Sequence, residues 1–275
     1  MPQNPRVELL YPSGVQGLLE EARIDVTEIL DRLPVSRAAA MTEDAGIKFE
    51  TNQFPMYFTG AFEAPLVLVH LNPKLSKRMD DQKFTTFDEY LDGHRRFGHL
   101  HWEHDPKYRS AFDRKQVRFL QHFGVIEFLN DTDPPCSRTN PARAIDHKLQ
   151  LELVPYATPD FPTNRFSAED LAPHFKRVLD VVAAYDRKYV LFCGAVFEKL
   201  LKQSGYELEW DYHDFHLPLV AGGMSKNPYH LSNVLINYSG EPVQAAVARS
   251  FAIPGIPMSH YGQMCHQLYD AWKRE

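Results

Sequence analysis

Asn72 follows an apolar run, residues 65–71, which contains one histidine, and Pro73 comes directly after it. Such a run predicts a fully buried strand whose last residues enter a loop. In open α/β sheets, ligands bind outside the carboxyl ends of the parallel strands. Polar or small residues also end three later apolar runs. We therefore expect one site, with His70, Asn72 and Pro73 from the first run, Glu152 and Tyr156 from the second, Gly194 from the third, and Asn237, Ser239 and Gly240 from the fourth.

The side chains of this set are amides, a histidine, a hydroxyl, a tyrosine and one carboxylate. Groups of this kind orient water and read the edge of a planar ligand. The chain contains no G-x-S-x-G, H-E-x-x-H, P-loop or G-x-G-x-x-G motif. Serine-type acyl transfer, zinc proteolysis, phosphoryl transfer from ATP and Rossmann-type hydride transfer are therefore disfavoured.

The elements that must position these residues are strands and helices in alternation. Apolar runs without alternation are typical of parallel strands that are covered on both faces. We predict strands near 65–73, 149–156, 189–194 and 232–240, helices near 14–33, 111–123, 167–182 and 195–205, after Pro242 and at the end of the chain, and a loop at 36–47. This order predicts an α/β fold, a three-layer α/β/α sandwich around a four-stranded parallel sheet. We expect one domain over residues 1–275, with an insertion at about 75–110.

Two short motifs resemble those of the uracil-DNA glycosylase superfamily. Its members carry G-x-[DN]-P-[GY] after the first strand and a motif such as N-P-S-G or H-P-S-P after the fourth. This chain has His-Leu-Asn-Pro-Lys at residues 70–74 and Asn-Tyr-Ser-Gly at residues 237–240. His70 and Lys74 take the places of the motif glycines. The resemblance covers roughly residues 60–75 and 149–252, and it implies a uracil-DNA glycosylase-like fold.

The resemblance also implies a reaction, hydrolysis of the N-glycosidic bond of a base that is flipped out of a duplex or single-stranded in DNA. Asn72 would position the attacking water, and Pro73 would shape the backbone around it. Phe84 or Phe87 would stack on the base. These residues, with His70, Lys74, Tyr156, Gly194 and Gly240 around them, would form the substrate site of a DNA-repair hydrolase.

The remaining roles concern the base that leaves. Asn237 and Ser239 would hold the departing base or the adjacent phosphate, which places Ser239 with Asn72 in the catalytic pair. Glu152 lies about where some members have the asparagine that reads uracil. An ionised carboxylate only accepts hydrogen bonds, so it suits an amino-bearing base such as cytosine. Two alternatives stay open: a non-catalytic nucleotide or nucleic-acid binding module of the same fold, and a hydrolase of small nucleosides.

The segment 75–110 interleaves aromatic residues with lysines and arginines. That composition suits stacking on exposed bases beside a phosphate chain, and it equally suits a small aromatic subcore with a solvated rim. This segment also contains four histidines, His94, His99, His101 and His104. They could bind a metal ion, with His101 and His104 on one helix face, or they could form a polar surface. We expect no metal and no cofactor.

Composition bounds the remaining classes. The net charge of −6 argues against a strong, uniform electrostatic grip on nucleic acid, but it allows a local basic patch. The three cysteines are far apart and contain no C-x-x-C, which predicts a reducing compartment without a disulfide framework. No apolar run is long enough to span a bilayer. We expect a cytoplasmic monomer whose partner is DNA, another single-stranded nucleic acid or a nucleotide.

Overall fold

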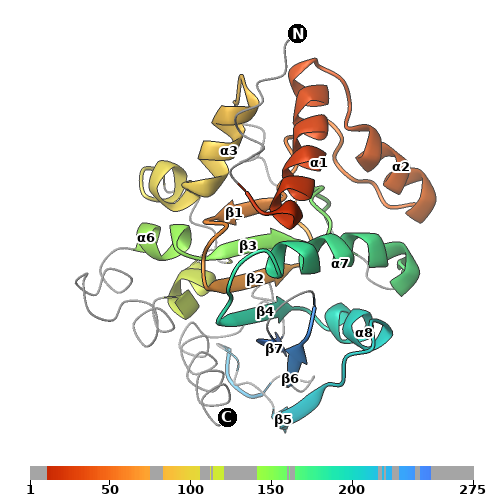
Figure 1. The fold of residues 1–275 in the computed structure, drawn as a ribbon, viewed down its shortest axis with the longest axis vertical. Coiled ribbons are helices and arrows are strands. Elements are labelled where there is room, and N and C mark those ends of the chain that lie inside the picture. Colours follow the sequence, from red (N-terminus) through yellow and green to blue (C-terminus); the bar gives the residue numbers. More distant parts are fainter. Residues whose placement is uncertain are drawn as a thin grey trace.

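A computed structural model describes residues 11–74, 83–105, 112, 114–120, 141–159, 161, 165–215, 219, 221–224, 229–238 and 242–248. The strands are β1 (Phe58–Gly60), β2 (Leu66–His70), β3 (Leu149–Glu152), β4 (Tyr189–Cys193), β5 (Glu209–Phe215), β6 (Tyr229–Ile236) and β7 (Val243–Ala248). The helices are α1 (Ser13–Leu30), α2 (Ser36–Ala45), α3 (Phe87–Arg95), the π-helical turn η3 (Gly98–Trp102), α6 (Pro141–Asp146), α7 (Ala168–Val182) and α8 (Val196–Gln203). Residues 114–120 are also helical. The fold is α/β (Figure 1).

The strands form one seven-stranded mixed sheet in the order β1-β3-β2-β4-β7-β6-β5. The four central strands, β3, β2, β4 and β7, run parallel to one another. β1 is antiparallel to β3 at one side, and β6 and β5 continue the sheet antiparallel at the other. The sheet therefore has a four-stranded parallel centre, but it extends beyond the four parallel strands that we predicted.

The fourth parallel strand is not the one predicted. The run 232–240 contributes to β6, which is antiparallel to β7, and the helix predicted after Pro242 is strand β7. Only six residues separate the two strands, and a connection that short joins antiparallel strands, whereas a parallel pair needs a crossover of a dozen or more residues. The alanines of β7 favour a helix locally, but burial between β4 and β6 overrides that preference.

Hydrophobic clusters cover both faces of the parallel strands. On one face, Val67 and Val69 of β2 pack with α1, α7 and α8 (Figure 1). On the other face, Leu66 and Leu68 pack with the helical residues 114–120 and with α6. Alternate residues of β2 thus point into two separate cores, which explains why its sequence is apolar without alternation.

Local signals placed several helices correctly. α1 and α7 confirm the helices predicted at 14–33 and 167–182, and α8 confirms the helix after the 189–194 strand. The loop predicted at 36–47 is wrong, because residues 36–45 form α2, which ends at Gly46 with a left-handed φ of 61°. The predicted insertion holds α3 and η3, while residues 75–82, 106–111 and the predicted last helix lie outside the described residues. No described helix combines the length and the apolar character needed to cross a bilayer.

Candidate functional site

Asn72 lies just past the carboxyl end of β2, and main-chain carbonyls hold its carboxamide. Its Nδ2 donates to the carbonyl oxygen of Pro73 at 2.9 Å and to that of Tyr156 at 3.2 Å. Two carbonyl acceptors identify this atom as the nitrogen, so Oδ1 points elsewhere as an acceptor. No described residue donates a hydrogen bond to Oδ1. The Asn72 side chain is therefore fixed in orientation, with one acceptor left for water or a ligand.

The loop after β2 is attached to the segment after β3. The main-chain N–H of Thr158 donates to the carbonyl of Pro73, and Lys74 forms a parallel bridge with Thr158. Pro73 is buried, Asn72 is half-buried and Lys74 is exposed. Of the residues predicted after the first two strands, Asn72 and Lys74 are thus the ones whose side chains solvent reaches most readily.

His70 and Glu152 come together as predicted, but below the surface. They are partners in the parallel register of β2 and β3, and each is at most 4% exposed. Gln150 donates to Oε1 of Glu152 at 2.7 Å, and Gln116 donates to Nε2 of His70 at 3.1 Å. Gln116 also donates to Oε1 of Gln150 at 2.9 Å, which joins the two pairs. A ligand at the sheet edge cannot contact Glu152 without moving the residues that cover it.

The side chain of Lys148 is buried beside these polar residues. Nζ of Lys148 donates to Oε1 of Gln150 and to Oγ1 of Thr59, both at 2.8 Å. Burial raises the pKa of Glu152 to about 8, although the Gln150 hydrogen bond and Lys148 act against this shift. Burial, aided by Lys148, lowers the pKa of His70 to about 3. Glu152 is therefore mostly protonated and His70 neutral at pH 7, so the expectation of an ionised, accepting Glu152 is wrong.

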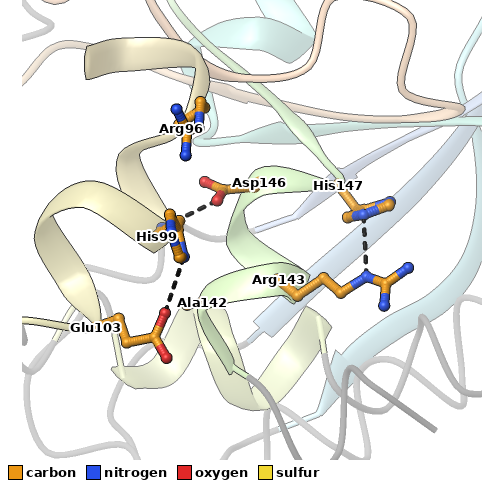
Figure 2. Close-up of a pocket in the computed structure, with 7 residues that line it drawn as sticks. All are labelled: Arg96, His99, Glu103, Ala142, Arg143, Asp146 and His147. Carbon is orange, nitrogen blue, oxygen red and sulfur yellow. Dashed lines mark hydrogen bonds and ion pairs between the residues drawn. The ribbon is translucent and has the colours of Figure 1, made fainter. Parts of the chain in front are cut away.

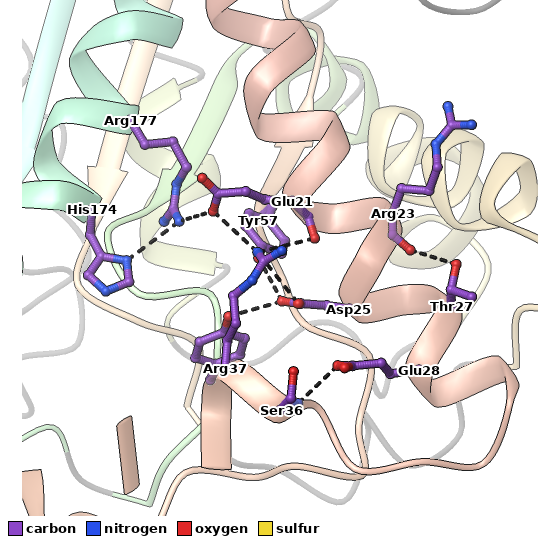
Figure 3. Close-up of polar contacts among 11 residues, drawn as sticks. Glu21, Arg23, Asp25, Thr27, Glu28, Ser36, Arg37, Tyr57, His174 and Arg177 are labelled. Atoms are coloured by element: carbon purple, nitrogen blue, oxygen red, sulfur yellow. Dashed lines mark hydrogen bonds and ion pairs between the residues drawn. The ribbon is translucent and has the colours of Figure 1, made fainter. Parts of the chain in front are cut away.

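Tyr156 belongs to a second buried network, on the other face of the sheet. Its hydroxyl donates to Oδ2 of Asp25 at 3.0 Å. The Tyr57 hydroxyl donates to the same oxygen at 2.6 Å, and Figure 3 shows Tyr57 beside Asp25. Arg37 lies 3.5 Å from Oδ1 of Asp25. Burial raises the pKa of Asp25, against the effect of these partners. The phenol of Tyr156 therefore joins the segment that follows β3 to α1, while the main-chain carbonyl of Tyr156 accepts a hydrogen bond from Asn72.

The two phenylalanines proposed to stack on a base are half-buried and pack against other side chains of the protein. The Phe84 ring lies 5.1 Å from Phe54 and 5.6 Å from Tyr90, both edge to face. Phe87 stacks on Tyr90 at 5.8 Å, and the Arg23 guanidinium lies 4.8 Å from its ring. These contacts match the alternative of an aromatic subcore in the 75–110 segment.

The residues predicted to join the site from the third and fourth strands lie at opposite edges of the sheet. Gly194, after β4, donates its N–H to the carbonyl of Ala248 at the end of β7, on the same edge as Asn72. Asn237 is exposed at the opposite edge, because β6 runs antiparallel and its last residue, Ile236, pairs with Val243 at the start of β7. Ser239, Gly240 and the residues after Ala248 lie outside the described residues.

Several residues of these networks were missed, although the sequence carried a signal for them. Lys148, Gln150 and Glu152 alternate with leucines, which places three polar side chains on one face of a buried strand. Gln116 follows Phe112 by four residues and precedes Leu120 by four, so it lies on the apolar stripe of its helix. A polar residue on an apolar stripe predicts a buried polar partner.

The histidines of the 75–110 segment divide into buried and exposed ones. His94 is buried, and its Nδ1 lies 2.9 Å from the carbonyl of Tyr90. The His101 ring packs on Phe97. The structure brings His99 and His104 together with Glu103, whereas the predicted pair was His101 and His104.

Comparisons with known proteins do not assign the chain to a family. No protein-family model matches the chain, and no curated protein matches it either.

Proposed function

We propose that the chain hydrolyses the N-glycosidic bond of a flipped or single-stranded base in DNA, at the edge of the sheet where β2 and β3 end. The orientation of Asn72 is the observation that carries the proposal. Two carbonyls hold its Nδ2, so Oδ1 is a preorganised acceptor at the edge where parallel α/β sheets bind ligands. The resemblance of residues 70–74 to a uracil-DNA glycosylase motif points to the same residue.

Asn72 positions the nucleophile in this reaction. Its Oδ1 accepts a hydrogen bond from a water molecule and directs the water oxygen at C1′ of the sugar. The C1′–N bond breaks, its electron pair leaves with the base, and the water proton ends on the base or in solvent. An amide is too weak a base to remove that proton in the ground state, so the contribution of Asn72 is orientation. Lys74, exposed two residues later, is available to a phosphate.

His70 and Glu152 lie in the interior at the ends of β2 and β3, where they stabilise this edge of the sheet. Both are buried and uncharged at neutral pH, and the Gln150–Gln116 bridge fixes their side chains. Because neither reaches solvent, selection of the base rests on other groups of the site. The ends of β2 and β3 are thereby held in register, and the Pro73 and Tyr156 carbonyls stay in place around Asn72.

The test is base release from single-stranded and duplex oligonucleotides that each carry one uracil or another modified base, read as alkali-sensitive abasic sites. We expect Asn72→Ala to slow release about 100-fold, since misplacing a reacting group costs about that factor. Asn52→Ala, at an exposed asparagine in a turn, is the matched control and should act like the wild type. The proposal fails if the wild type releases no base from any substrate at stoichiometric amounts.

A non-catalytic binding module is the second candidate, and the position of Asn237 favours it. The motif that was expected to supply the catalytic partner begins with Asn237, and Asn237 lies at the opposite edge of the sheet from Asn72. The same panel of oligonucleotides distinguishes the candidates by fluorescence anisotropy across a salt series. Salt-sensitive binding without base release supports the binding module, whereas base release that Asn72→Ala abolishes excludes it.

A further inference from the structure

A pocket outside the sheet edge lies between η3 and α6. It has a cavity volume of about 310 Å³ and is lined by Arg96, His99, Glu103, Ala142, Arg143, Asp146 and His147. Figure 2 shows His99 and Glu103 side by side on the turn that faces α6. His104, which follows Glu103, completes a cluster in which one ligand atom of each of the three residues lies within 4.8 Å of the others.

The π-helical geometry of this turn explains the cluster. The N–H of Glu103 donates to the carbonyl of Gly98, five residues earlier, at 2.9 Å. A π turn is wider than an α turn, so residues four and five positions later both lie above a given residue. His99, Glu103 and His104 have that spacing. In a regular α-helix His99 would face Glu103 but not His104.

The turn is anchored to the rest of the protein. The Asp146 carboxylate at the end of α6 accepts the main-chain N–H of Gly98 at 2.6 Å and that of His99 at 2.9 Å. Gly98 must be a glycine, because a Cβ there would lie 2.1 Å from the Ala142 carbonyl oxygen. The backbone of His99 is therefore held against α6, while the three side chains of the cluster are exposed.

We infer that His99, Glu103 and His104 bind a divalent transition-metal ion, with zinc as the natural occupant. Two imidazole nitrogens and one carboxylate oxygen are a donor set that zinc accepts, with water in the fourth position. Nδ1 of His99 already lies 3.1 Å from Oε2 of Glu103, close to the separation of about 3.3 Å between two ligands of a tetrahedral zinc ion. A ring nitrogen of His104 lies within 4.8 Å of a ligand atom of each of the other two residues.

The surroundings place the ion at the edge of the pocket. His99 and Glu103 line the pocket as well as the cluster, and Arg96 and Arg143 also line it. The arginines lower the affinity for a cation on electrostatic grounds, but they suit an anionic ligand in the fourth position. The inference does not depend on the proposed hydrolysis at Asn72, which belongs to a different edge of the fold.

The test is titration of tag-free, chelator-treated protein with Co²⁺, followed by displacement with Zn²⁺. Tetrahedral Co²⁺ gives visible d–d absorption, so this readout does not require any enzymatic activity. We expect one Co²⁺ per chain and loss of the absorption when Zn²⁺ is added. His99→Ala and His104→Ala should each weaken binding at least tenfold, and Glu103→Gln should weaken it less because its amide oxygen remains a ligand.

His147→Ala is the matched control, since this histidine lines the pocket but is not in the cluster. It should bind Co²⁺ like the wild type. The inference is overturned if the wild type gives no d–d absorption with excess Co²⁺, or if His99→Ala and His104→Ala bind it as tightly as the wild type does. Circular dichroism of each variant shows whether a loss of binding reflects a loss of the fold.

Discussion

Glu152 shows at the residue scale how burial changes what a side chain can do. From its type alone, a carboxylate at the end of a strand is an acceptor for an amino group. In the folded protein Gln150 occupies Oε1, the carboxyl group is 3% exposed, and its pKa is about 8. The proton that it keeps at neutral pH makes it a neutral part of the interior, whereas a ligand can reach Asn72 and Lys74.

The raised pKa of Glu152 predicts a pH-dependent stability. The folded protein holds a proton that the unfolded chain releases near pH 4.5, so stability is full below that pH and is lost as the pH rises through about 8. The shift corresponds to an upper limit of about 5 kcal/mol. Between pH 6.5 and 8, above the range in which His70 and the other histidines with a lowered pKa make stability rise with pH, we expect the free energy of unfolding of the wild type to fall. Glu152→Gln should remove most of this decrease, measured by urea denaturation.

Glu43→Gln, at an exposed position of α2, serves as the control for that substitution and should keep the wild-type pH dependence. Parallel pH curves for Glu152→Gln and the wild type would contradict the assignment of a buried, protonated carboxyl group.

At the element scale, α7 is a helix whose start the sequence marks with capping residues. Ser167 accepts the N–H of Asp170 and the Asp170 carboxylate accepts the N–H of Ser167, a capping box that starts α7. The β6–β7 pair shows the opposite case. Its turn residues between two apolar runs fit a hairpin as well as a strand followed by a helix, and only the pairing of β7 with β4 decides between them.

The capping box of α7 should contribute measurably to stability. Ser167→Ala leaves the N–H of Asp170 without its side-chain acceptor, so we expect a loss of about 1 kcal/mol in the free energy of unfolding. Ser36→Ala is the matched control, because Ser36 begins α2 without a side-chain capping bond. Equal losses for the two variants in urea denaturation would argue against the capping contribution.

At the scale of the whole molecule, the two motifs that we expected at one edge of the sheet begin at opposite edges. Asn72 and Gly194 lie where the parallel strands end, with Ala248 beside them. Asn237 lies where these strands begin, and its neighbour Tyr238 donates to Asp180 near the end of α7. The two predicted motifs therefore begin at opposite edges of the sheet.

This separation predicts different effects for two asparagines that both follow an apolar strand. Asn237→Ala should bind a fluorescent single-stranded oligonucleotide within twofold of the wild type and release bases at the same rate, because Asn237 is at the far edge. Asn72→Ala is the comparison variant and should lose activity. If Asn237→Ala instead loses binding while its circular dichroism spectrum is unchanged, the ligand is not confined to the Asn72 edge.

The sequence by itself determined the features that depend on neighbouring residues. The apolar runs at 66–70 and 189–193 form buried strands, the apolar stripes of α1 and α7 form helices, and a capping box starts α7, since periodicity and capping act within a few residues. Asn72 at a strand end was recognised on the same basis. These signals are local, and the tertiary structure leaves them unchanged.

Only the tertiary structure decided the direction of β6, the burial of Glu152 and the grouping of His99 with His104. Gln116 reaches His70 across 46 residues of chain, and Tyr156 reaches Asp25 across 131. Such contacts, and the pKa shifts that follow from burial, depend on how distant segments pack. A pattern of residue types cannot specify that packing, because the same local signals are compatible with several arrangements of the strands.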